Sequence, residues 1–292
     1  MAGGRGVRLA AESAVLEPEL FLCVDLHDTE GRGSEALVRL ASGVEPAWLP
    51  AERLRTAVEV AFDAERERVV AWKRTRWDDL TIAESEVPAA GEAAERALAE
   101  AASLRLDRAL PLDDPEVVSF LARLRSLRQW MPELGLPALD EQELRGLLPA
   151  LAAGRRSFAE LRRAPLLAVL AGTLSRQQAE ALRREAPERL AVPSGSLIRL
   201  AYEPGKPPVL AARIQELFGL AETPRVAAGR VPVLLHLLAP NSRPQQVTTD
   251  LRSFWETTYP QVRRELQGRY PRHAWPEDPW NAPPERRPRK RR

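Results

Sequence analysis

Short apolar runs separated by polar residues dominate the first 88 residues and predict β-strands. The runs occupy residues 6–10, 20–26, 36–40, 68–76 and 80–87. Alternation of apolar and polar positions between turn-forming residues is the pattern of half-buried strands. Between the third and fourth runs, Leu54 and Val58 are spaced four residues apart. This spacing predicts a helix over residues 50–58.

The order of these elements predicts a barrel at the amino-terminal end. Three strands, a helix and two further strands follow one another, which is the order of the OB-fold. This fold is a five-stranded barrel that often binds single-stranded nucleic acid. We therefore expect residues 1–88 to form an OB-like five-stranded β-barrel.

The periodicity changes to that of helices after residue 88. Residues 89–106 are rich in Ala, Glu and Leu, and Asp114-Pro115 is a favourable helix start. The expected apolar face of that helix consists of Val117, Phe120, Leu121, Leu124 and Leu127. Further helices are expected from about 141 to 186, which makes residues 89–187 a helical connecting region. We interpret its apolar stripes as core.

A β-hairpin and a buried strand are predicted in the region that follows. Residues 197–202 and 208–214 flank the turn sequence Glu203-Pro-Gly-Lys206. Such a turn between two apolar runs favours a hairpin. Residues 231–238 form another apolar run, which predicts a strand.

Two helices are expected after that strand. Thr248 and Thr249 can cap a helix that begins at Asp250, because hydroxyl and carboxylate groups satisfy free backbone amides at a helix start. The predicted inner face of this helix is Leu251, Phe254, Trp255 and Thr258. Pro260 suits the first turn of a second helix, which carries Val262 and Leu266.

Together these patterns indicate an α+β protein. Residues 1–88 are predicted to be the barrel, 89–187 the helical region and 188–280 a C-terminal domain of hairpin, strand and helices. Residues 281–292, rich in Pro and Arg, are expected to be a basic disordered tail.

Charge is distributed unevenly along the 292 residues. The formal net charge is only +2, yet the first 100 residues contain 12 basic and 20 acidic side chains. The chain ends with Arg286-Arg-Pro-Arg-Lys-Arg-Arg292. Such a tail attracts polyanions without reading sequence. The alternative is a solvated terminus that only maintains solubility.

The residues needed for several kinds of chemistry are absent from the sequence. The only Gly-Lys pair, Gly205-Lys206, is followed by Pro207, so no phosphate-binding loop ends in Gly-Lys-Ser/Thr. One cysteine and three histidines argue against a zinc site. Asp25 and His27 share a strand face but are more typical of a surface pair. We therefore predict no catalytic residue, metal site or cofactor in this chain.

The sequence also favours a cytoplasmic location. The longest apolar runs, at 165–172 and 231–239, are far shorter than the ~20 residues needed to cross a bilayer. The first residues lack the apolar stretch of a signal peptide. The single Cys23 fits a reducing compartment. We expect no membrane partner.

Cations and aromatic residues alternate at the end of one predicted strand. Base stacking on an exposed aromatic ring is worth about 1–3 kcal/mol. In the alternative interpretation, one tryptophan fills the barrel while the arginines pair with the many carboxylates nearby. The candidate nucleic-acid-binding residues here are Trp72, Lys73, Arg74, Arg76 and Trp77.

A second candidate surface lies near the carboxyl end. In the two predicted helices, the arginines leave the apolar stripes and are expected to point outward. In the alternative interpretation, the sequence around residues 269–276 is a Pro-braced strap that fastens the chain end to the barrel. The candidate residues are Arg243, Gln245, Arg252, Arg263, Arg264, Arg269, Tyr270, Arg272, His273 and Trp275.

Several sequence blocks carry a family resemblance. They are Val192-Pro-Ser-Gly195, Ala212-Arg-Ile-Gln-Glu-Leu-Phe-Gly219, Arg243-Pro-Gln-Gln-Val-Thr-Thr-Asp-Leu251, Gly268-Arg-Tyr-Pro-Arg-His273 and Trp275-Pro-Glu-Asp-Pro279. With these blocks, the third region resembles the C-terminal region of HrpB-type bacterial ATP-dependent helicases of the DEAH/RHA class. The resemblance implies an RNA helicase with two RecA-like lobes, a winged helix, a helical bundle, an OB-fold and this C-terminal extension.

The sequence departs from that pattern, because it contains neither a phosphate loop nor a DEAH-type box. ATP and magnesium are therefore expected only through a separate helicase core, supplied in cis or in trans. Three functions remain open. They are the accessory C-terminal part of such a helicase, a free-standing protein that binds single-stranded nucleic acid or RNA, and a protein–protein scaffold.

Overall fold

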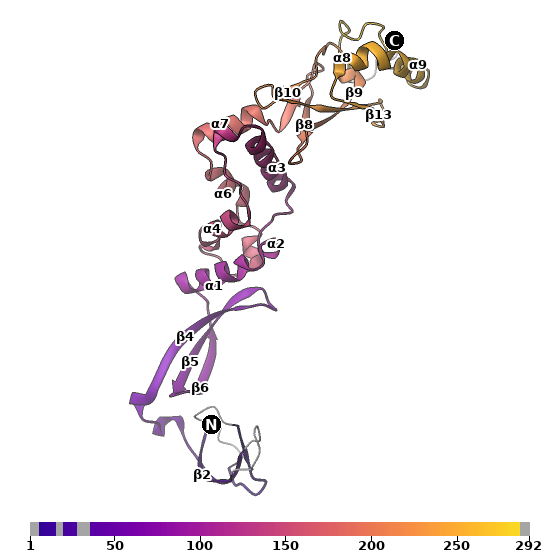
Figure 1. Cartoon of the computed structure of the whole chain (residues 1–292). Helices are drawn as coiled ribbons and strands as arrows, with labels where there is room; N and C mark the ends of the chain where they lie inside the picture. Colours follow the sequence, from indigo (N-terminus) through magenta and orange to yellow (C-terminus); the bar gives the residue numbers. More distant parts are fainter. Residues whose placement is uncertain (1–5, 16–19, 28–35, 287–292) are drawn as a thin grey trace. The chain divides into compact units, whose positions relative to one another are not determined.

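The computed structural model describes residues 6–15, 20–27 and 36–286, and these residues form two compact units. The first unit contains the chain up to Ala109 together with Leu148–Arg163. The second contains Leu110–Leu147 and the chain from Ala164 onward. The elements of both units are labelled in Figure 1. Sheets and helices occur in both, which confirms the α+β class.

A small sheet of three strands opens the first unit. Its strands are β1 (Val7–Leu9), β2 (Phe21–His27) and β3 (Ala36–Gly43), in the order β1-β3-β2. β1 runs parallel to β3, whereas β2 is antiparallel to it. Two short 3₁₀ turns, Pro46–Trp48 and Ala51–Arg53, lead out of this sheet.

A second sheet is an antiparallel meander of longer strands. It consists of β4 (Leu54–Asp63), β5 (Arg68–Trp77) and β6 (Leu80–Val87), and it is visible in Figure 1 as a long ribbon. The helix predicted over residues 50–58 is wrong, because most of that segment belongs to β4. All ten residues of β4 pair with β5, from Leu54↔Trp77 to Asp63↔Arg68. Its β-branched residues suit this pleated ladder better than a helix.

The structure does not confirm the five-stranded barrel predicted for residues 1–88. The described strands of this region lie in two separate three-stranded sheets. No strand of one sheet pairs with a strand of the other among the described residues. Because residues 54–63 form the strand β4 instead of a helix, β4, β5 and β6 make a three-stranded meander. The order of three strands, a helix and two strands expected for the OB-fold is therefore absent from this region.

Helices cover the second sheet. In α1 (Gly91–Ser103), the buried residues Ala94, Leu98 and Ala102 recur at helical spacing, and the helix packs on β4 and β5. The unit also contains α2 (Leu106–Ala109), the end of α4 (Glu141–Ala152) and α5 (Phe158–Leu161). The ring centroids of Phe62 and Phe158 are 4.7 Å apart, which joins β4 to α5.

The second unit begins with helices that the sequence predicts well. They are α3 (Pro115–Trp130), the short η3 (Pro132–Leu134), the first part of α4, α6 (Leu166–Gly172) and α7 (Arg176–Glu185). The Asp114 carboxylate accepts a hydrogen bond of 2.7 Å from the Glu116 amide and so caps α3. The predicted apolar face of α3 is buried throughout, from Val117 to Leu127.

A five-stranded sheet forms the C-terminal part of the second unit. Its order is β13-β12-β9-β8-β7, with the strands β7 (Arg189–Ala191), β8 (Leu197–Ala201), β9 (Val209–Arg213), β12 (Leu234–Leu238) and β13 (Pro244–Thr248). The pairing of Leu200 with Leu210 confirms the predicted hairpin. Beyond it, β12 runs parallel to β9 and antiparallel to β13. A separate pair, β10 (Arg225–Val226) and β11 (Val231–Pro232), lies before β12.

The two predicted helices at the carboxyl end are present, with a π-helical turn between them. Asp250 accepts a 2.9 Å hydrogen bond from the Ser253 amide at the start of α8 (Leu251–Ser253). The π turn η5 (Phe254–Thr258) leads into α9 (Tyr259–Arg269), and Pro260 lies in its first turn. Because a π turn holds one residue more than an α turn, Tyr259 takes the inner position expected for Thr258.

Aromatic rings fill the core below these helices. Trp255 and Tyr259 are almost fully buried, and their rings meet edge to face at 5.2 Å. Phe218, in the loop after β9, packs on both. Within the part of the chain that the structure describes, no helix has the length and apolarity needed to cross a bilayer.

Candidate nucleic-acid interface

The arginines of the first candidate set contact carboxylates of the neighbouring strands. Arg74 lies between Glu59 and Glu84, with N···O distances of 2.5 Å to each. Arg76 reaches Glu59 at 2.8 Å. The hydrogen bonds that Arg74 donates to Glu84 and Glu59 raise its pKa. The charges of Arg74 and Arg76 are therefore already paired within the sheet. This pairing favours the alternative interpretation, in which the arginines of this strand contact nearby carboxylates.

The two tryptophans of this set are half-buried. The Arg53 guanidinium lies 4.2 Å from the centroid of the Trp77 ring, and Arg53 also pairs with Asp78. A cation above a ring occupies the face on which a base would stack. Lys73 is exposed and Trp72 is half-buried. The strand therefore offers few unpaired cations, and one ring face of Trp77 is already occupied by Arg53.

Several cations of the second candidate set are exposed on the second unit. Arg243, directly before β13, has an exposed side chain, as do Arg264, Arg269 and Arg272. Arg252 also points outward as expected, and it lies 3.2 Å from Glu256 and 3.6 Å from Glu222. Gln245 on β13 donates to the Pro244 carbonyl at 2.9 Å.

The segment formed by residues 270–286, here called the C-terminal strap, is fastened to the second unit by side chains. Trp275 is buried, and its Nε1 donates to the Tyr270 carbonyl at 3.0 Å. The Tyr259 hydroxyl donates to the Pro276 carbonyl at 3.0 Å. The strap thus packs on the C-terminal core, rather than on a barrel as the alternative interpretation expected.

Arg263 departs from the prediction, because it turns toward the strap instead of into solvent. Its Nε donates to the Trp275 carbonyl at 2.8 Å, and Nη2 reaches Glu277 at 3.0 Å. His273 is half-buried on the same strap, where partial burial lowers its pKa. Arg263 is therefore engaged in holding the strap.

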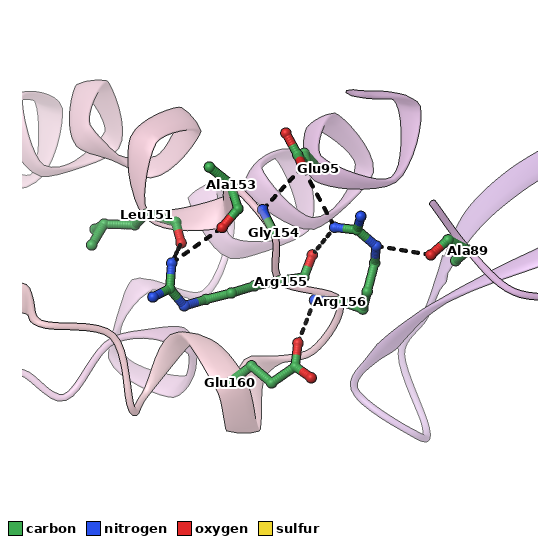
Figure 2. Close-up of polar contacts among 8 residues, drawn as sticks. All are labelled: Ala89, Glu95, Leu151, Ala153, Gly154, Arg155, Arg156 and Glu160. Atoms are coloured by element: carbon green, nitrogen blue, oxygen red, sulfur yellow. Dashed lines mark hydrogen bonds and ion pairs between the residues drawn. The ribbon is translucent and has the colours of Figure 1, made fainter. Parts of the chain in front are cut away.

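A network of arginine contacts within the first unit joins the loop after α4 to α1 and to the segment that precedes α1 (Figure 2). Arg156 Nε donates to the Ala89 carbonyl at 2.8 Å, and its Nη1 lies 3.7 Å from Glu95. Glu95 also accepts from the Gly154 amide at 2.9 Å. The Arg156 carbonyl in turn accepts from the Val69 amide at 2.7 Å, at the start of β5. These contacts fix the loop within the first unit.

Sequence reasoning missed one cleft in the second unit. It has a volume of about 440 Å³, and Arg213 and Arg286 both line it. Arg213 ends an apolar strand and Arg286 belongs to the predicted basic tail, so the sequence did not indicate either as a residue of a cleft. Among the residues described in the structure, no three His, Cys, Asp or Glu side chains are grouped to hold a metal ion.

Comparisons with known proteins show which family model and which proteins this chain is similar to. Residues 147–279 match the family model described as ATP-dependent helicase C-terminal. Over 300 aligned residues, the chain is 33% identical to the ATP-dependent RNA helicase HrpB of Escherichia coli strain K12. This match covers 99% of the chain but 37% of the relative.

Two crystal structures of E. coli HrpB have similar folds. One, described as a DExH-box NTPase, gives a TM-score of 0.66 at 32% identity and covers 91% of this chain and 34% of that one. The other, described as a DEAH/RHA helicase, gives 0.58 at 29% identity, with 92% and 34% covered. The chain thus spans about a third of the length of these relatives. The resemblance to the C-terminal region of HrpB-type helicases is confirmed.

Proposed function

We propose that this chain is the accessory C-terminal portion of an HrpB-like ATP-dependent RNA helicase. In this role it contributes nucleic-acid binding and docks on a helicase core that its own sequence does not contain. The observation that carries the proposal is the match of nearly the whole chain to one part of an RNA helicase. The lack of a Gly-Lys-Ser/Thr loop in the sequence agrees with it, since ATP hydrolysis then belongs to the core.

The exposed arginines of the second unit support the nucleic-acid part of the proposal. Arg243, Arg269 and Arg272 are exposed, and no carboxylate lies within ion-pair distance of them among the described residues. Arginine forms bidentate contacts with phosphate. Neutralising phosphates releases condensed counterions, so binding of this kind weakens steeply as salt rises.

The proposed location is the cytoplasm.

Exposed apolar side chains on the first sheet support the docking part of the proposal. Leu22 and Val24 of β2 are 60% and 55% exposed, and Leu40 of β3 is 57% exposed. Apolar side chains gathered on one small sheet are typical of a surface that another protein covers. We take this surface, Leu22, Val24, Leu26 and Leu40, as the apolar face of β2 and β3.

Titration of the purified chain with a labelled 12-nucleotide single-stranded RNA tests the nucleic-acid part. We expect binding at 50 mM salt that weakens by at least tenfold at 200 mM, and no ATP hydrolysis by the chain alone. A chain truncated after Arg286 is the matched variant, because it removes Arg287, Arg289 and the last three cations only. The truncated chain is expected to bind more weakly but still measurably, through the exposed arginines of the second unit.

The outcomes separate the three functions. Absence of binding at 50 mM salt would contradict the nucleic-acid part and favour a protein–protein scaffold. Complete loss of binding on truncation would assign the affinity to the basic tail alone, as expected for a free-standing single-strand-binding protein. ATP turnover by the pure chain would contradict the accessory role.

A further inference from the structure

Two strands of the C-terminal sheet separate and leave a cleft between them. β8 and β9 pair only at Leu200↔Leu210 and Ala201↔Val209. Beyond these pairs, β9 continues beside β12, while β8 continues beside β7. The cleft of about 440 Å³ lies where the strands diverge, with Ser196 and Ile198 on the side of β8.

Two arginines line this cleft without a carboxylate partner. Arg213 is the last residue of β9 and is half-buried, and Arg286 lies at the end of the strap. Among the described residues, no Asp or Glu oxygen lies within ion-pair distance of either guanidinium. A half-buried guanidinium without a counter-ion favours an anion that it can contact in bidentate fashion.

The one carboxylate that lines the cleft is engaged by hydroxyl groups. Glu216 accepts a 2.7 Å hydrogen bond from Ser196 Oγ, and Ser194 Oγ lies 3.5 Å from the same oxygen. Glu285, next to Arg286, accepts from the Ala274 amide at 2.9 Å. Arg213 and Arg286 together carry more charge than the single carboxylate in the cleft wall.

Backbone contacts hold Arg286 at the cleft. The Glu285 amide donates to the Gln215 carbonyl at 2.9 Å, one residue before Glu216. Further back along the strap, the Pro279 carbonyl accepts from the Gly219 amide at 2.9 Å. The position of Arg286 is therefore set by the fold. The basic residues from Arg287 onward follow it directly in the sequence.

A turn with an unusual backbone completes the wall of the cleft. Ser242, between β12 and β13, has a φ of +65°, in the left-handed region that favours glycine. The Asn241 side chain holds this turn by accepting from the Arg243 amide at 3.1 Å. The turn places a hydroxyl in the lining of the cleft and the exposed Arg243 next to it in the chain.

From these observations we infer that the cleft lined by Ser196, Arg213, Ser242 and Arg286 binds a phosphate of a single-stranded nucleic-acid backbone. This inference rests on the proposed function and adds the residues and the atoms of the ligand that they recognise. The guanidinium groups contact the phosphate oxygens, and the Ser242 hydroxyl can donate to them, whereas the Ser196 hydroxyl donates to Glu216. The cleft is open and larger than one phosphate. Cationic residues also neighbour the lining residues in the sequence, at Arg243 and from Arg287 onward. Both features suit a continuous strand of nucleic acid better than a free ion.

Salt-dependent RNA binding by charge-removing variants of the full chain tests this inference. Each of Arg213→Gln and Arg286→Gln is expected to lower the slope of log K against log salt by about 0.7, the value for one phosphate contact with a single strand. Arg213→Lys keeps the charge and is expected to keep the slope. Arg189→Gln is the matched control, because Arg189 is exposed on β7 and does not line the cleft.

The outcomes distinguish this inference from the proposed function. If the wild-type chain binds RNA and both glutamine variants keep its slope and affinity, the cleft is not the site, although the proposed function stands. If the wild-type chain binds no RNA, the proposed function and the inference both fail. Titration with inorganic phosphate, followed by the Nε–H signal of Arg213, provides the second arm. Micromolar binding of phosphate without any change in RNA affinity in the variants would indicate a site for a free anion and overturn the inference.

Discussion

Many arginine side chains of this protein bind backbone carbonyl groups. Arg123 donates to the Ala186 carbonyl at 2.7 Å, and Arg125 donates to that of Leu139 at 3.0 Å. Arg128, Arg156 and Arg263 make similar contacts. Such contacts join segments far apart in the sequence, so they cannot be inferred from the position of an arginine in the chain. A basic residue in the sequence is therefore weak evidence for a binding surface.

At the scale of single residues, Arg156 leads to a prediction about stability. Its side chain is 27% exposed and joins Ala89, Arg155 and Glu95 (Figure 2). Hydrogen bonds of charged groups contribute about 1.5–3 kcal/mol, so we expect Arg156→Ala to lower the free energy of unfolding of the first unit by that amount. Amide hydrogen exchange of β5 in increasing urea measures the change in the first unit.

The matched control for this variant is Arg66→Ala. Arg66 forms an exposed pair with Asp63 at 3.6 Å in the same unit, and such pairs contribute about 0–1 kcal/mol. If both variants lose the same amount of unfolding free energy, the contacts of Arg156 have no special part in holding the loop.

Elements defined by local signals were predicted well from the sequence. The cap of α3 at Asp114, the turn between β8 and β9, and Pro260 in the first turn of α9 each depend on neighbouring residues. Strand β4 was not predicted, because its pairing with β5 is a long-range contact that overrides the helical spacing of Leu54 and Val58. The barrel failed for the same reason, since closing a sheet depends on contacts between distant strands.

Two glycines in the second unit lead to opposite predictions. Gly219 has a φ of +85° and donates to the Pro279 carbonyl, whereas Gly146 lies exposed within α4 with open space around it. We expect Gly219→Ala to destabilise the unit by about 1–2 kcal/mol, because a β-carbon disfavours the left-handed backbone. We expect Gly146→Ala to stabilise it by about 0.5–1 kcal/mol, because alanine favours the helix. Urea denaturation followed by tryptophan fluorescence measures both, and a shift of equal sign would contradict the argument.

At the scale of the whole molecule, only part of the candidate interface could be predicted from the sequence. The acidic excess of the first 100 residues correctly suggested that the arginines of β5 are paired, as Arg74 is by Glu59 and Glu84. The cleft with Arg213 and Arg286 was missed, because it depends on the divergence of two strands and on the path by which the strap brings Arg286 to them. Neither feature leaves a pattern in the sequence.

The apolar face of β2 and β3 leads to the prediction that concerns the whole helicase. The relatives continue for nearly twice the length of this chain beyond the part that it matches. If that remaining part docks on the apolar face, charges placed there should prevent the contact. We expect the chain to co-elute with the remaining part of E. coli HrpB, expressed as a separate protein, and Leu22→Glu with Val24→Glu to weaken this association at least tenfold. Burying a charge without a partner is costly, whereas the same charge on a free surface is not.

The folded state should tolerate this double substitution, because Leu22 and Val24 are more than half exposed. Leu104→Glu is the matched control, since Leu104 is 84% exposed and lies after α1, away from β2 in the sequence. Gel filtration of the mixtures, with circular dichroism of each variant alone, separates loss of docking from loss of folding. Association that is unchanged in the double variant, or lost equally in the Leu104 control, would mean that the apolar face is not where the core binds. In that case a chain that still co-elutes contacts the remaining part of HrpB through another surface, and the charged side chains of the second unit would be the next to test.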